Sequence, residues 1–484
     1  MFDIGSLFAG FFIVEWTIRT IMLFVVPRRL RPASANAWLL LIMVAPAVGT
    51  ILFYMFSDPK LPKSRREKLK KVNTLTDHEL TQLQGSNKGV FIDLQNADHQ
   101  SIAKLATKLG GLPPMAGNKV QFFHEYDSTF KAIAKEVDSA EEYIHVQYFI
   151  AAMDESTQVI FDALARAVER GVKVRFMWDK VLSRAYRGNS DMEKFLLRAG
   201  ADVQQMMPLS LVPGPGFTRP DLRNHRKAVI IDGRTAFTGS QNLVNSSYNR
   251  KDDIVNEEIV SKIEGPAVWQ LNNVFRSDWF TETGQPLLDI LEDEDIPAPA
   301  GRVTAQVLPS GPAHEYDNNL KFYTSMVYSA KKQIRIVVPY FIPDESFLDA
   351  LIAAAHRGVD VTMINSEAID KLLAGHAQRS YYDQLLKVGI KIYLYNKPNF
   401  LHTKQVIIDD EVAIFGSSNL DIRSFELDFE LNTIIYDRQV VRELLAIESG
   451  YLQRSSQIDP KHWDKRSIAL KMLDGLSRLT AAFQ

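Results

Sequence analysis

Two similar stretches of sequence decide how this chain folds. The first reads Asn-His-Arg-Lys-Ala-Val-Ile-Ile-Asp-Gly over residues 224–233, and the second reads Leu-His-Thr-Lys-Gln-Val-Ile-Ile-Asp-Asp over residues 401–410. Both have the pattern H-x-K-x4-D, and the apolar, β-branched residues after the lysine predict a strand. Side chains two positions apart lie on the same face of a strand, so each histidine is expected to point the same way as its lysine.

The surroundings of these stretches are repeated as well. In the first half an apolar run over 143–150 precedes a helical pattern and a second extended run over 170–177. The second half has the same order, with extended runs at 334–342 and 357–364. Alternating strands and helices predict α/β layers. Repetition of the whole pattern predicts two similar α/β domains that are related by a pseudo-twofold axis and share one active site.

Polar residues that suit phosphate chemistry follow each stretch. Thr-Gly-Ser-Gln-Asn occupies residues 238–242, and Phe-Gly-Ser-Ser-Asn occupies residues 415–419. Each domain therefore offers an imidazole, an ammonium, a hydroxyl and an amide, and the natural partner of that set is a phosphodiester anion. The candidate residues are His225, Lys227, His402 and Lys404 for catalysis, with Ser240, Asn242, Ser417 and Asn419 as phosphate-binding donors.

The composition narrows the chemistry further. The 484 residues include no cysteine, which excludes a thiolate nucleophile, a disulfide framework and a zinc–thiolate or iron–sulfur site. Lysine and arginine number 56 against 58 aspartate and glutamate, a net charge of −2 that argues against a dedicated nucleic-acid-binding protein. The sequence has no visible cluster of metal ligands, and we expect neither a metal nor a cofactor.

With two H-x-K-x4-D motifs, each followed by Gly-Ser-x-Asn, the chain resembles the phospholipase D superfamily and, more closely, the bacterial cardiolipin synthases. The closer resemblance extends through residues 37–40, 46–49, 263–266, 339–345 and 419–425. It departs from the family at Asp428, where the family often has asparagine. The resemblance implies a phospho-histidine mechanism with His225 as the nucleophile and His402 as the acid and base. The sequence by itself is symmetric and leaves that order open.

The resemblance also assigns the remaining site residues. It includes Asp232 and Asp409 in the catalytic motifs, although their place at the far end of a strand favours a role in holding the turn. Glu430 and Glu258 are the acceptors expected to orient the two histidines, in the manner of the third member of a triad. Glu257 is an adjacent alternative to Glu258.

The implied enzyme is a phosphatidyl transferase that makes cardiolipin and glycerol from two phosphatidylglycerol molecules. The alternative is phospholipase D-type hydrolysis of a phosphodiester, in lipid or, with less support, in nucleic acid. A non-enzymatic membrane scaffold is the third interpretation, and the products made from labelled phosphatidylglycerol distinguish all three. The sequence leaves open the range of acceptor alcohols and the oligomeric state.

Two long apolar runs lie within the first 57 residues. The runs Ile4–Val26 and Trp38–Phe56 are each about the ~20 residues that cross a hydrocarbon core. Glu15 and Arg19 interrupt the first run at a spacing that lets them pair on one helical face. A cleaved signal peptide fits less well, because no basic region precedes the first run. We therefore expect a two-helix transmembrane hairpin and a multi-pass protein of the bacterial inner membrane.

Basic residues predict which side of the membrane the catalytic domains occupy. The hinge between the two apolar runs, residues 27–32, contains Arg28, Arg29 and Arg31. By comparison, seven basic residues lie from Lys60 to Lys71. The positive-inside rule therefore favours the cytoplasm, and the basic run is expected to attract anionic phospholipid. The expected organisation is 1–57 membrane hairpin, 58–117 basic linker and connecting segment, 118–284 first domain, 285–300 linker and 301–484 second domain. The apolar segment 209–217 is interpreted as a loop, with an interfacial lid as the alternative.

Overall fold

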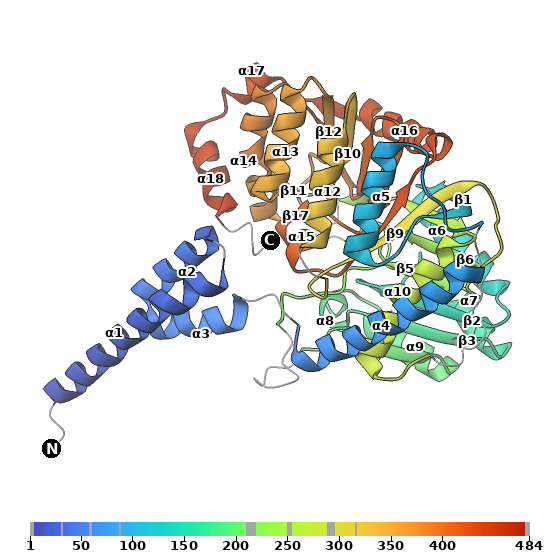
Figure 1. Ribbon diagram of the computed structural model, residues 1–484, viewed down its shortest axis with the longest axis horizontal. Helices are drawn as coiled ribbons and strands as arrows, with labels where there is room; N and C mark the ends of the chain where they lie inside the picture. The colour runs from blue at the N-terminus through green and yellow to red at the C-terminus, as the bar shows by residue number, and fades with distance from the viewer. Residues whose placement is uncertain are drawn as a thin grey trace.

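A 15-stranded sheet runs through the body of this computed structural model, the part that follows the N-terminal helices (Figure 1). The structure describes residues 4–30, 32–57, 61–86, 89–209, 219–248, 254–287, 296–314 and 317–479. Residues 210–217 of the segment predicted to be a loop, with a lid as the alternative, lie outside the described residues. So do residues 288–295 of the predicted linker, Arg31 and Lys60.

The first half of the body follows the predicted alternation. Its strands are β1 (Met115–Phe123), β2 (Tyr143–Tyr148), β3 (Lys173–Trp178), β4 (Asp202–Gln205), β5 (Ala228–Ile231), β6 (Thr235–Gly239), β7 (Val255–Glu257) and β8 (Val260–Glu264). Its helices are α6 (Tyr126–Asp138), α7 (Gln158–Glu169), α8 (Lys180–Ser183), α9 (Asn189–Ala199) and α10 (Ala267–Thr283). Every residue of β2 and β5 is buried, as expected for strands covered on both faces.

The second half repeats the order of the sheet strands of the first half and adds several short elements. Its strands are β9 (Val303–Ser310), β10 (Gln333–Val337), β11 (Phe341–Ile342), β12 (Asp360–Ser366), β13 (Lys391–Tyr395), β14 (Asn399–Leu401), β15 (Gln405–Ile408), β16 (Val412–Gly416), β17 (Leu420–Asp421), β18 (Glu430–Ile435) and β19 (Ser455–Gln457). Its helices are α12 (Asn318–Ser329), α13 (Glu345–His356), α14 (Leu372–Lys387), α15 (Ile422–Glu426), α16 (Arg438–Gln453), α17 (Pro460–Trp463) and α18 (Ile468–Arg478).

The strand order is the same from the centre of the sheet outward in both directions. The first half reads β1-β8-β6-β5-β2-β3-β4, and the second reads β9-β18-β16-β15-β10-β12-β13, with β19 added at the edge. The two halves meet where β1 pairs with β9 in antiparallel fashion, with Met115 opposite Ala305. The strands that follow the two histidine–lysine pairs, β5 and β15, therefore occupy corresponding positions on either side of the junction.

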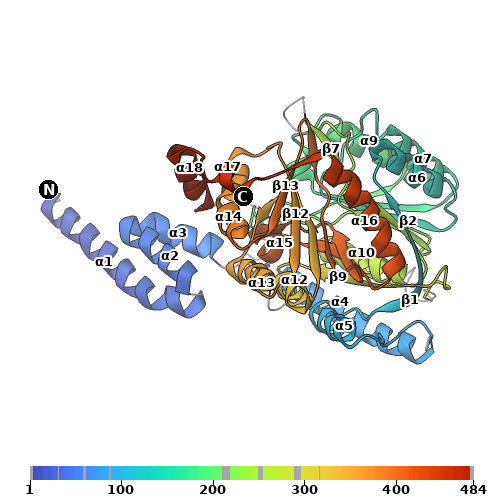
Figure 2. The same ribbon diagram turned by 90° about the horizontal axis from the view of Figure 1, so that it is seen from above.

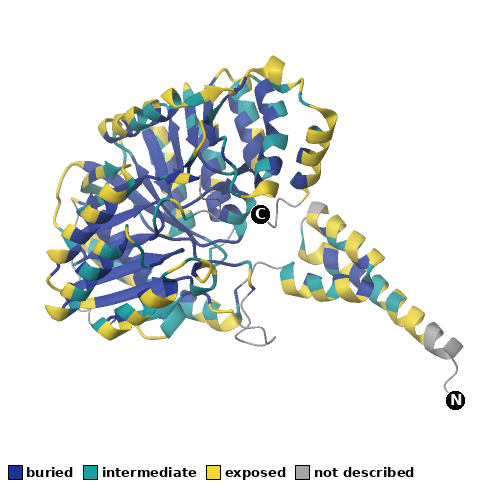
Figure 3. Ribbon diagram, turned by 180° about the vertical axis from the view of Figure 1, so that it is seen from behind, coloured by how far each residue is buried: buried dark blue, intermediate teal, exposed yellow. Residues whose placement is uncertain are grey.

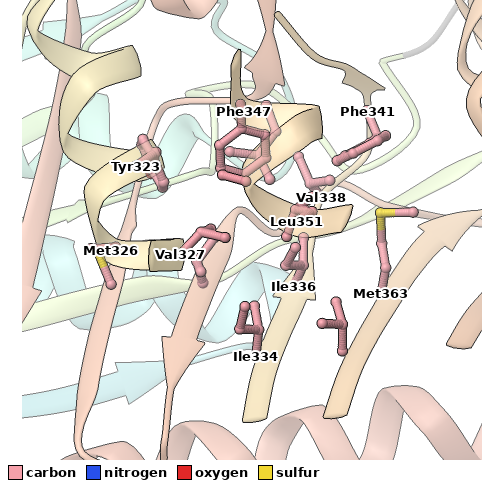
Figure 4. Packing of buried hydrophobic residues seen from close by; sticks show 14 of the residues in the cluster. Tyr323, Met326, Val327, Ile334, Ile336, Val338, Phe341, Phe347, Leu351 and Met363 are labelled. Atoms are coloured by element: carbon pink, nitrogen blue, oxygen red, sulfur yellow. The ribbon is translucent and has the colours of Figure 1, made fainter. Parts of the chain in front are cut away.

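Helices packed on the sheet bury the core. In the second half α12 and α13 cover β10 and β12, and Figure 4 shows Tyr323, Phe347, Ile336 and Met363 among the side chains between them. Phe347 is fully buried, and its replacement by alanine would cost about 3–5 kcal/mol of stability. This packing fixes the strands, and the strands fix the site residues at their ends.

The N-terminal arm projects from the body and consists of α1 (Ile4–Arg29), α2 (Pro32–Val44) and α3 (Pro46–Phe56) (Figure 1). Many of its apolar residues are exposed, including Phe11, Trp16 and Phe24, and much of the arm is coloured yellow in the ribbon of Figure 3. Among the described residues, α1 is the one helix long and apolar enough to cross a membrane. Glu15 and Arg19 pair at 3.2 Å, as their spacing predicts.

The predicted second spanning helix, 38–56, is not a single helix. It breaks at Ala45, because Pro46 has no N–H and its ring clashes with the preceding turn. α3 then packs back on α2 so closely that a Cβ on Gly49 would lie 2.8 Å from the Cα of Ile42. With 13 and 11 residues, α2 and α3 are only about 20 and about 17 Å long, too short for a hydrocarbon core of about 30 Å.

The segment 58–117, predicted to be a basic linker, contains two helices, α4 (Lys63–Ser86) and α5 (Ala97–Gly110). α4 lies along α10, where Arg65 forms two hydrogen bonds with Glu282 at 2.7 and 2.6 Å. Lys68 donates to the carbonyl of Thr281 at 3.1 Å. Part of the basic run therefore fastens α4 to the first domain.

Candidate active site

Two short parallel pairings between the halves build the site. β7 of the first half pairs with β14 of the second, so Glu257 lies opposite Leu401. On the other side a parallel bridge joins Asn224 to Phe429. The residue after each paired position is a predicted site residue, so the two pairings place His402 beside Glu258 and His225 beside Glu430.

The histidine–glutamate pairs are crossed between the halves. Nδ1 of His225 lies 3.0 Å from both carboxylate oxygens of Glu430, and Nδ1 of His402 lies 2.7 Å from Oε1 of Glu258. A carboxylate at Nδ1 favours the tautomer in which Nδ1–H donates and Nε2 carries the lone pair. Each imidazole therefore has Nε2 available for chemistry. The structure selects Glu258, since the side chain of Glu257 instead accepts from Tyr395, Asn399 and Arg454.

Serine hydroxyls hold Glu430 and the backbone next to Glu258. Ser417 and Ser424 both donate to Glu430, the latter at 2.7 Å. Ser240 donates to the carbonyl of Ile259 at 3.2 Å and accepts from its backbone N–H at 3.0 Å. The serines of the two Gly-Ser-x-Asn segments thus fix the segments that contain the two glutamates.

The glycine before each serine is required by close packing. A Cβ on Gly239 would lie 2.2 Å from the carbonyl oxygen of Ile259, and one on Gly416 would lie 2.3 Å from that of Leu431. Only glycine allows β6 and β16 to approach the segments that carry the glutamates so closely. The glycines of the motif therefore bring each serine to the segment that contains the glutamate.

The two lysines are buried, and each donates to the carbonyl of its own histidine. Both Nζ–O distances are 2.7 Å. Burial lowers the pKa of Lys227 to about 7 and that of Lys404 to about 8, even though Glu430 and Glu258 favour the charged forms. An ammonium with a depressed pKa gains most from an anionic substrate, because a phosphate charge beside it restores the protonated form.

Burial also lowers the pKa of both histidines, to different degrees. It lowers the pKa of His225 well below the ordinary value, and the charges of Lys227, Lys404 and His402 lower it further. Burial likewise lowers the pKa of His402, where the carboxylate of Glu258 acts in the opposite direction. His225 therefore has the stronger tendency to remain a neutral base, which is the form that can attack phosphorus.

Asp232 and Asp409 are engaged with the backbone. The carboxylate of Asp232 accepts from the N–H groups of Glu141, Glu142 and Tyr143, each at 2.9 Å. Asp409 accepts in the same way from Lys331, Lys332 and Gln333 at 2.7–2.9 Å. Both aspartates also have positive φ, which suits a turn after the strand. These contacts match the structural alternative for the two aspartates.

The two asparagines differ in their surroundings. Nδ2 of Asn242 donates to the hydroxyl of Tyr248 at 3.1 Å. Oδ1 of Asn419 is buried and has no hydrogen-bond partner within the part of the chain that the structure describes. Since the oxygen and nitrogen of an amide exchange places by rotation, Asn419 can direct an N–H at a substrate oxygen. Phe149 packs edge-on against His225, with ring centroids 4.6 Å apart.

Some residues at the site were not predicted from the sequence. Arg226, between the histidine and lysine of the first motif, donates to Asp278 at 2.7 Å and to the carbonyl of Glu430 at 3.1 Å. It therefore ties the first half to the backbone of the glutamate that holds His225. Arg226 is adjacent to His225, so its side chain lies on the opposite face of the extended segment. That position could have suggested from the sequence that the arginine is buried and paired. Ser424 lies in residues 419–425, which resemble the family, but no sequence pattern indicates its contact with Glu430.

Asp428, where the chain departs from the family, forms an ion pair with Arg423 at 3.0 Å. Burial raises the pKa of Asp428 to about 7. Over the described ranges, no group of three or more histidine and carboxylate side chains could hold a metal ion.

Comparison with known proteins relates this geometry to a family. The family described as "Cardiolipin synthase, PLD-like domain" matches residues 133–279 and 323–448. The protein named cardiolipin synthase A from Klebsiella pneumoniae (strain 342) is 32% identical over 464 residues, which cover 95% of this chain and 94% of that relative. Its namesake from Edwardsiella ictaluri (strain 93-146) is 31% identical over 467 residues, with 95% and 94% coverage.

A solved structure supports the fold. The crystal structure of phosphatidylserine synthase from Haemophilus influenzae Rd KW20 superposes with a TM-score of 0.61 at 16% identity, covering 79% of this chain and all of that one. At that identity the likeness concerns the fold alone, a mixed α/β fold with phospholipase D-like domains. From the family match and the full-length relatives, the chain belongs to the cardiolipin synthase family of phospholipase D-like proteins.

Proposed function

We propose that the protein transfers a phosphatidyl group from one phosphatidylglycerol molecule to another, which forms cardiolipin and releases glycerol. The observation that carries the mechanism is the pair of crossed histidine–glutamate contacts, with a buried lysine behind each histidine. Two oriented imidazoles provide a nucleophile and an acid–base group for two successive displacements at one phosphorus. The family match supports the same activity.

In the first displacement, Nε2 of neutral His225 attacks phosphorus. A bond forms between nitrogen and phosphorus, and the bond from phosphorus to the glycerol headgroup oxygen breaks. Protonated His402 gives its proton to that oxygen, so glycerol leaves as the alcohol. Glu430 stabilises the positive charge that the phosphorylated imidazole acquires, because its carboxylate already faces Nδ1 of His225.

In the second displacement, the headgroup hydroxyl of another phosphatidylglycerol gives its proton to His402. Its oxygen attacks phosphorus, the bond to His225 breaks, and cardiolipin is released. Glu258 supports the charge that His402 alternately gains and loses. Lys227 and Lys404 neutralise the non-bridging oxygens throughout, the role that metal ions have in other phosphoryl transfers. Asn419 and Asn242 add neutral contacts. Ser417 acts by holding Glu430, and Ser240 acts by holding the backbone of Ile259 beside Glu258.

The duplicated strand order supports the further proposal that the halves are related by a pseudo-twofold axis at the β1–β9 junction. Such an axis explains why the two pairings that build the site are alike. Asp232 and Asp409 then have equivalent structural roles in the two halves, each fixing the start of a neighbouring strand.

The protein is membrane-associated, and we propose that α1 spans the bilayer with the catalytic body on the cytoplasmic side. Arg28 and Arg29 lie at the end of α1 that leads toward the body. Because α2 and α3 fold back on each other, the chain returns to the side of these arginines before α4 begins. Arg28, Arg29 and the basic residues of α4 then lie on one side and favour the same orientation.

Labelled phosphatidylglycerol tests the proposed function. Incubated with the protein in vesicles, it should yield cardiolipin and glycerol in equal amounts. The His225→Ala variant should yield neither, whereas the exposed histidine control His356→Ala should resemble the parent protein. Phosphatidic acid as the main product would show that water is the acceptor and that the protein is a hydrolase.

A further inference from the structure

In the C-terminal helix α18 the polar face is buried and the apolar face is exposed, the reverse of the usual arrangement in a soluble protein. Its inward face is polar, with Asp474 and Ser477 each only 2% exposed. Its outward face contains Ile468, Met472 and Leu476, spaced four residues apart, and these side chains are 77%, 63% and 61% exposed. Figure 3 shows α18 largely in yellow at the edge of the body. Because the polar face of α18 packs against the protein, its apolar stripe is left exposed on the surface without a partner.

Polar contacts fasten α18 in this orientation. Asp474 pairs with His376 of α14 and with Arg466, both at 2.7 Å. The guanidinium of Arg478 lies over the ring of Tyr381, 4.4 Å from its centroid. A rotation of α18 that turned the apolar stripe inward would break all three contacts, so the stripe is a fixed feature of the surface.

The apolar surface continues from α18 onto α14. The contacts of His376 with Asp474 and of Asp383 with Arg466, directly before α18, show that the two helices run in opposite directions. The first turn of α14 therefore lies beside the last turn of α18, and this first turn exposes Leu372 and Leu373, which are 66% and 51% accessible. We call the stripe of α18 together with Leu372 and Leu373 the C-terminal apolar surface.

This surface lies on the side of the body that faces the N-terminal arm. Figures 1 and 2 both show α18 at the end of the body nearest α2 and α3. The arm also touches the body, since Arg219 lies over the ring of Phe56 with 5.8 Å to its centroid. A bilayer that holds the arm is therefore on the same side of the molecule as the C-terminal apolar surface.

We propose that the C-terminal apolar surface inserts into the interfacial region of the bilayer and holds the catalytic body against it. Two observations favour lipid over a protein partner. The surface lies on the side of the N-terminal arm. Basic residues also flank it: Lys465 precedes α18, Lys471 lies on α18, and Lys371 precedes α14. Apolar stripes bordered by basic residues are typical of helices that lie in the interface of anionic membranes.

The position of Lys371 connects this surface to catalysis. Its charge is close enough to lower the pKa of both His225 and Lys404, so it lies near the reacting groups. Its Nζ lies 4.9 Å from the centroid of the Tyr340 ring. Since Leu372 and Leu373 follow directly, insertion of the surface would bring the lipid headgroup layer to the residues beside the site. Headgroups could then reach the histidines without their acyl chains leaving the bilayer.

Single-cysteine labelling tests the proposal directly, because the parent chain has no cysteine. A fluorophore sensitive to polarity is attached at Met472→Cys in the full-length protein, reconstituted into vesicles of phosphatidylglycerol and phosphatidylcholine. The matched control is Leu197→Cys, an exposed leucine position on α9 with 55% accessibility. We expect the label at 472 to shift to shorter wavelength and to be quenched by lipids that carry a shallow nitroxide, and the label at 197 to show neither effect.

Two outcomes would overturn the proposal. A label at 472 that behaves like the label at 197 would show that the surface stays in water. A shift to shorter wavelength without quenching by nitroxide lipids would show that protein covers the surface, such as a second copy of the chain.

A second measurement separates this surface from the chemistry. The variant Met472→Gln/Leu476→Gln should lose at least about tenfold in turnover on vesicles, since two buried apolar contacts with the bilayer are removed. It should keep the parent turnover in detergent micelles, where no bilayer has to be engaged. Unchanged turnover on vesicles would refute the proposal. Failure of the parent protein to make cardiolipin in micelles would instead refute the proposed function and leave the labelling result standing.

Discussion

Replacement of Glu430 by glutamine tests the crossed arrangement of histidines and glutamates. Glu430 lies in the second half, yet its carboxylate accepts from Nδ1 of His225 in the first half. Glutamine keeps the shape but loses the charge, and its amide can present an N–H to Nδ1. His225 would then lose the acceptor that keeps Nε2 unprotonated and that stabilises the phosphorylated imidazole.

The expected loss follows from the burial of this contact. A hydrogen bond to a charged group contributes about 1.5–3 kcal/mol, and each ~1.4 kcal/mol changes a rate about tenfold. The covalent step should therefore slow by about 10- to 150-fold. Because Glu430 is 0% and His225 is 7% exposed, little water can replace the lost contact, and we expect the upper part of that range.

The assay compares two leaving groups in detergent micelles. With phosphatidylglycerol, both Glu430→Gln and Glu258→Gln should slow release of the headgroup. A phosphatidyl ester of an acidic phenol has a leaving group that needs no proton. With this substrate the Glu258→Gln variant should regain the parent rate of the first displacement, and the Glu430→Gln variant should not. Glu257→Gln is the matched control, since the Glu257 side chain contacts Tyr395 and not a histidine.

Two results would refute the reasoning. If the acidic leaving group rescues Glu430→Gln and not Glu258→Gln, the roles of the two histidines are reversed. If Glu257→Gln loses as much activity as Glu258→Gln, the carboxylate that orients His402 has been misassigned.

Four further predictions concern other parts of the structure. Lys227→Gln and Lys404→Gln should each lower kcat by about 10²–10³, measured in micelles, and near-normal turnover in either would contradict a phosphate-binding role. In the protein without substrate, Lys227 and Lys404 have pKa values of about 7 and about 8. The value of kcat/KM should therefore fall as the pH rises through that range. The fall in kcat should occur at higher pH, since bound phosphate favours the ammonium forms; a kcat/KM that rises there would be inconsistent with charged lysines. Asp232→Asn should lower the free energy of unfolding by about 1–3 kcal/mol with little change in kcat, as measured by denaturation and turnover, and an unchanged stability with lost activity would reverse that assignment. A reporter enzyme fused to the C-terminus should be active only in the cytoplasm, and external activity would contradict the proposed orientation.

Much of the fold could be predicted because the sequence repeats its own pattern. A strand, helix and strand followed by H-x-K-x4-D occur twice, and the sheet contains both sets in the same order from its centre. The family resemblance, rather than periodicity, indicated Glu430 and Glu258. The crossed pairing could not be predicted, because it depends on β7 meeting β14 and on Asn224 meeting Phe429, contacts between segments far apart in the chain.

Other features depend on three-dimensional contacts that no local pattern reports. The apolar run over 38–56 has the length of a spanning helix, but Pro46 and the tight packing of Gly49 on Ile42 divide it in two. Arg19 helps at the break by donating to the carbonyl of Met43 at 3.1 Å. The reversed face of α18 was also missed, since an amphipathic pattern does not say which face the body covers.

The most direct test of the proposed mechanism is to find which histidine holds the phosphatidyl group. The His402→Ala variant is given a phosphatidyl ester of an acidic phenol labelled at phosphorus, quenched at alkaline pH to preserve phospho-histidine, and mapped by mass spectrometry. We predict labelled lipid phosphate on His225 and none on the protein in His225→Ala. Label on His402 in the His225→Ala variant, or turnover without any labelled protein in either, would contradict the mechanism.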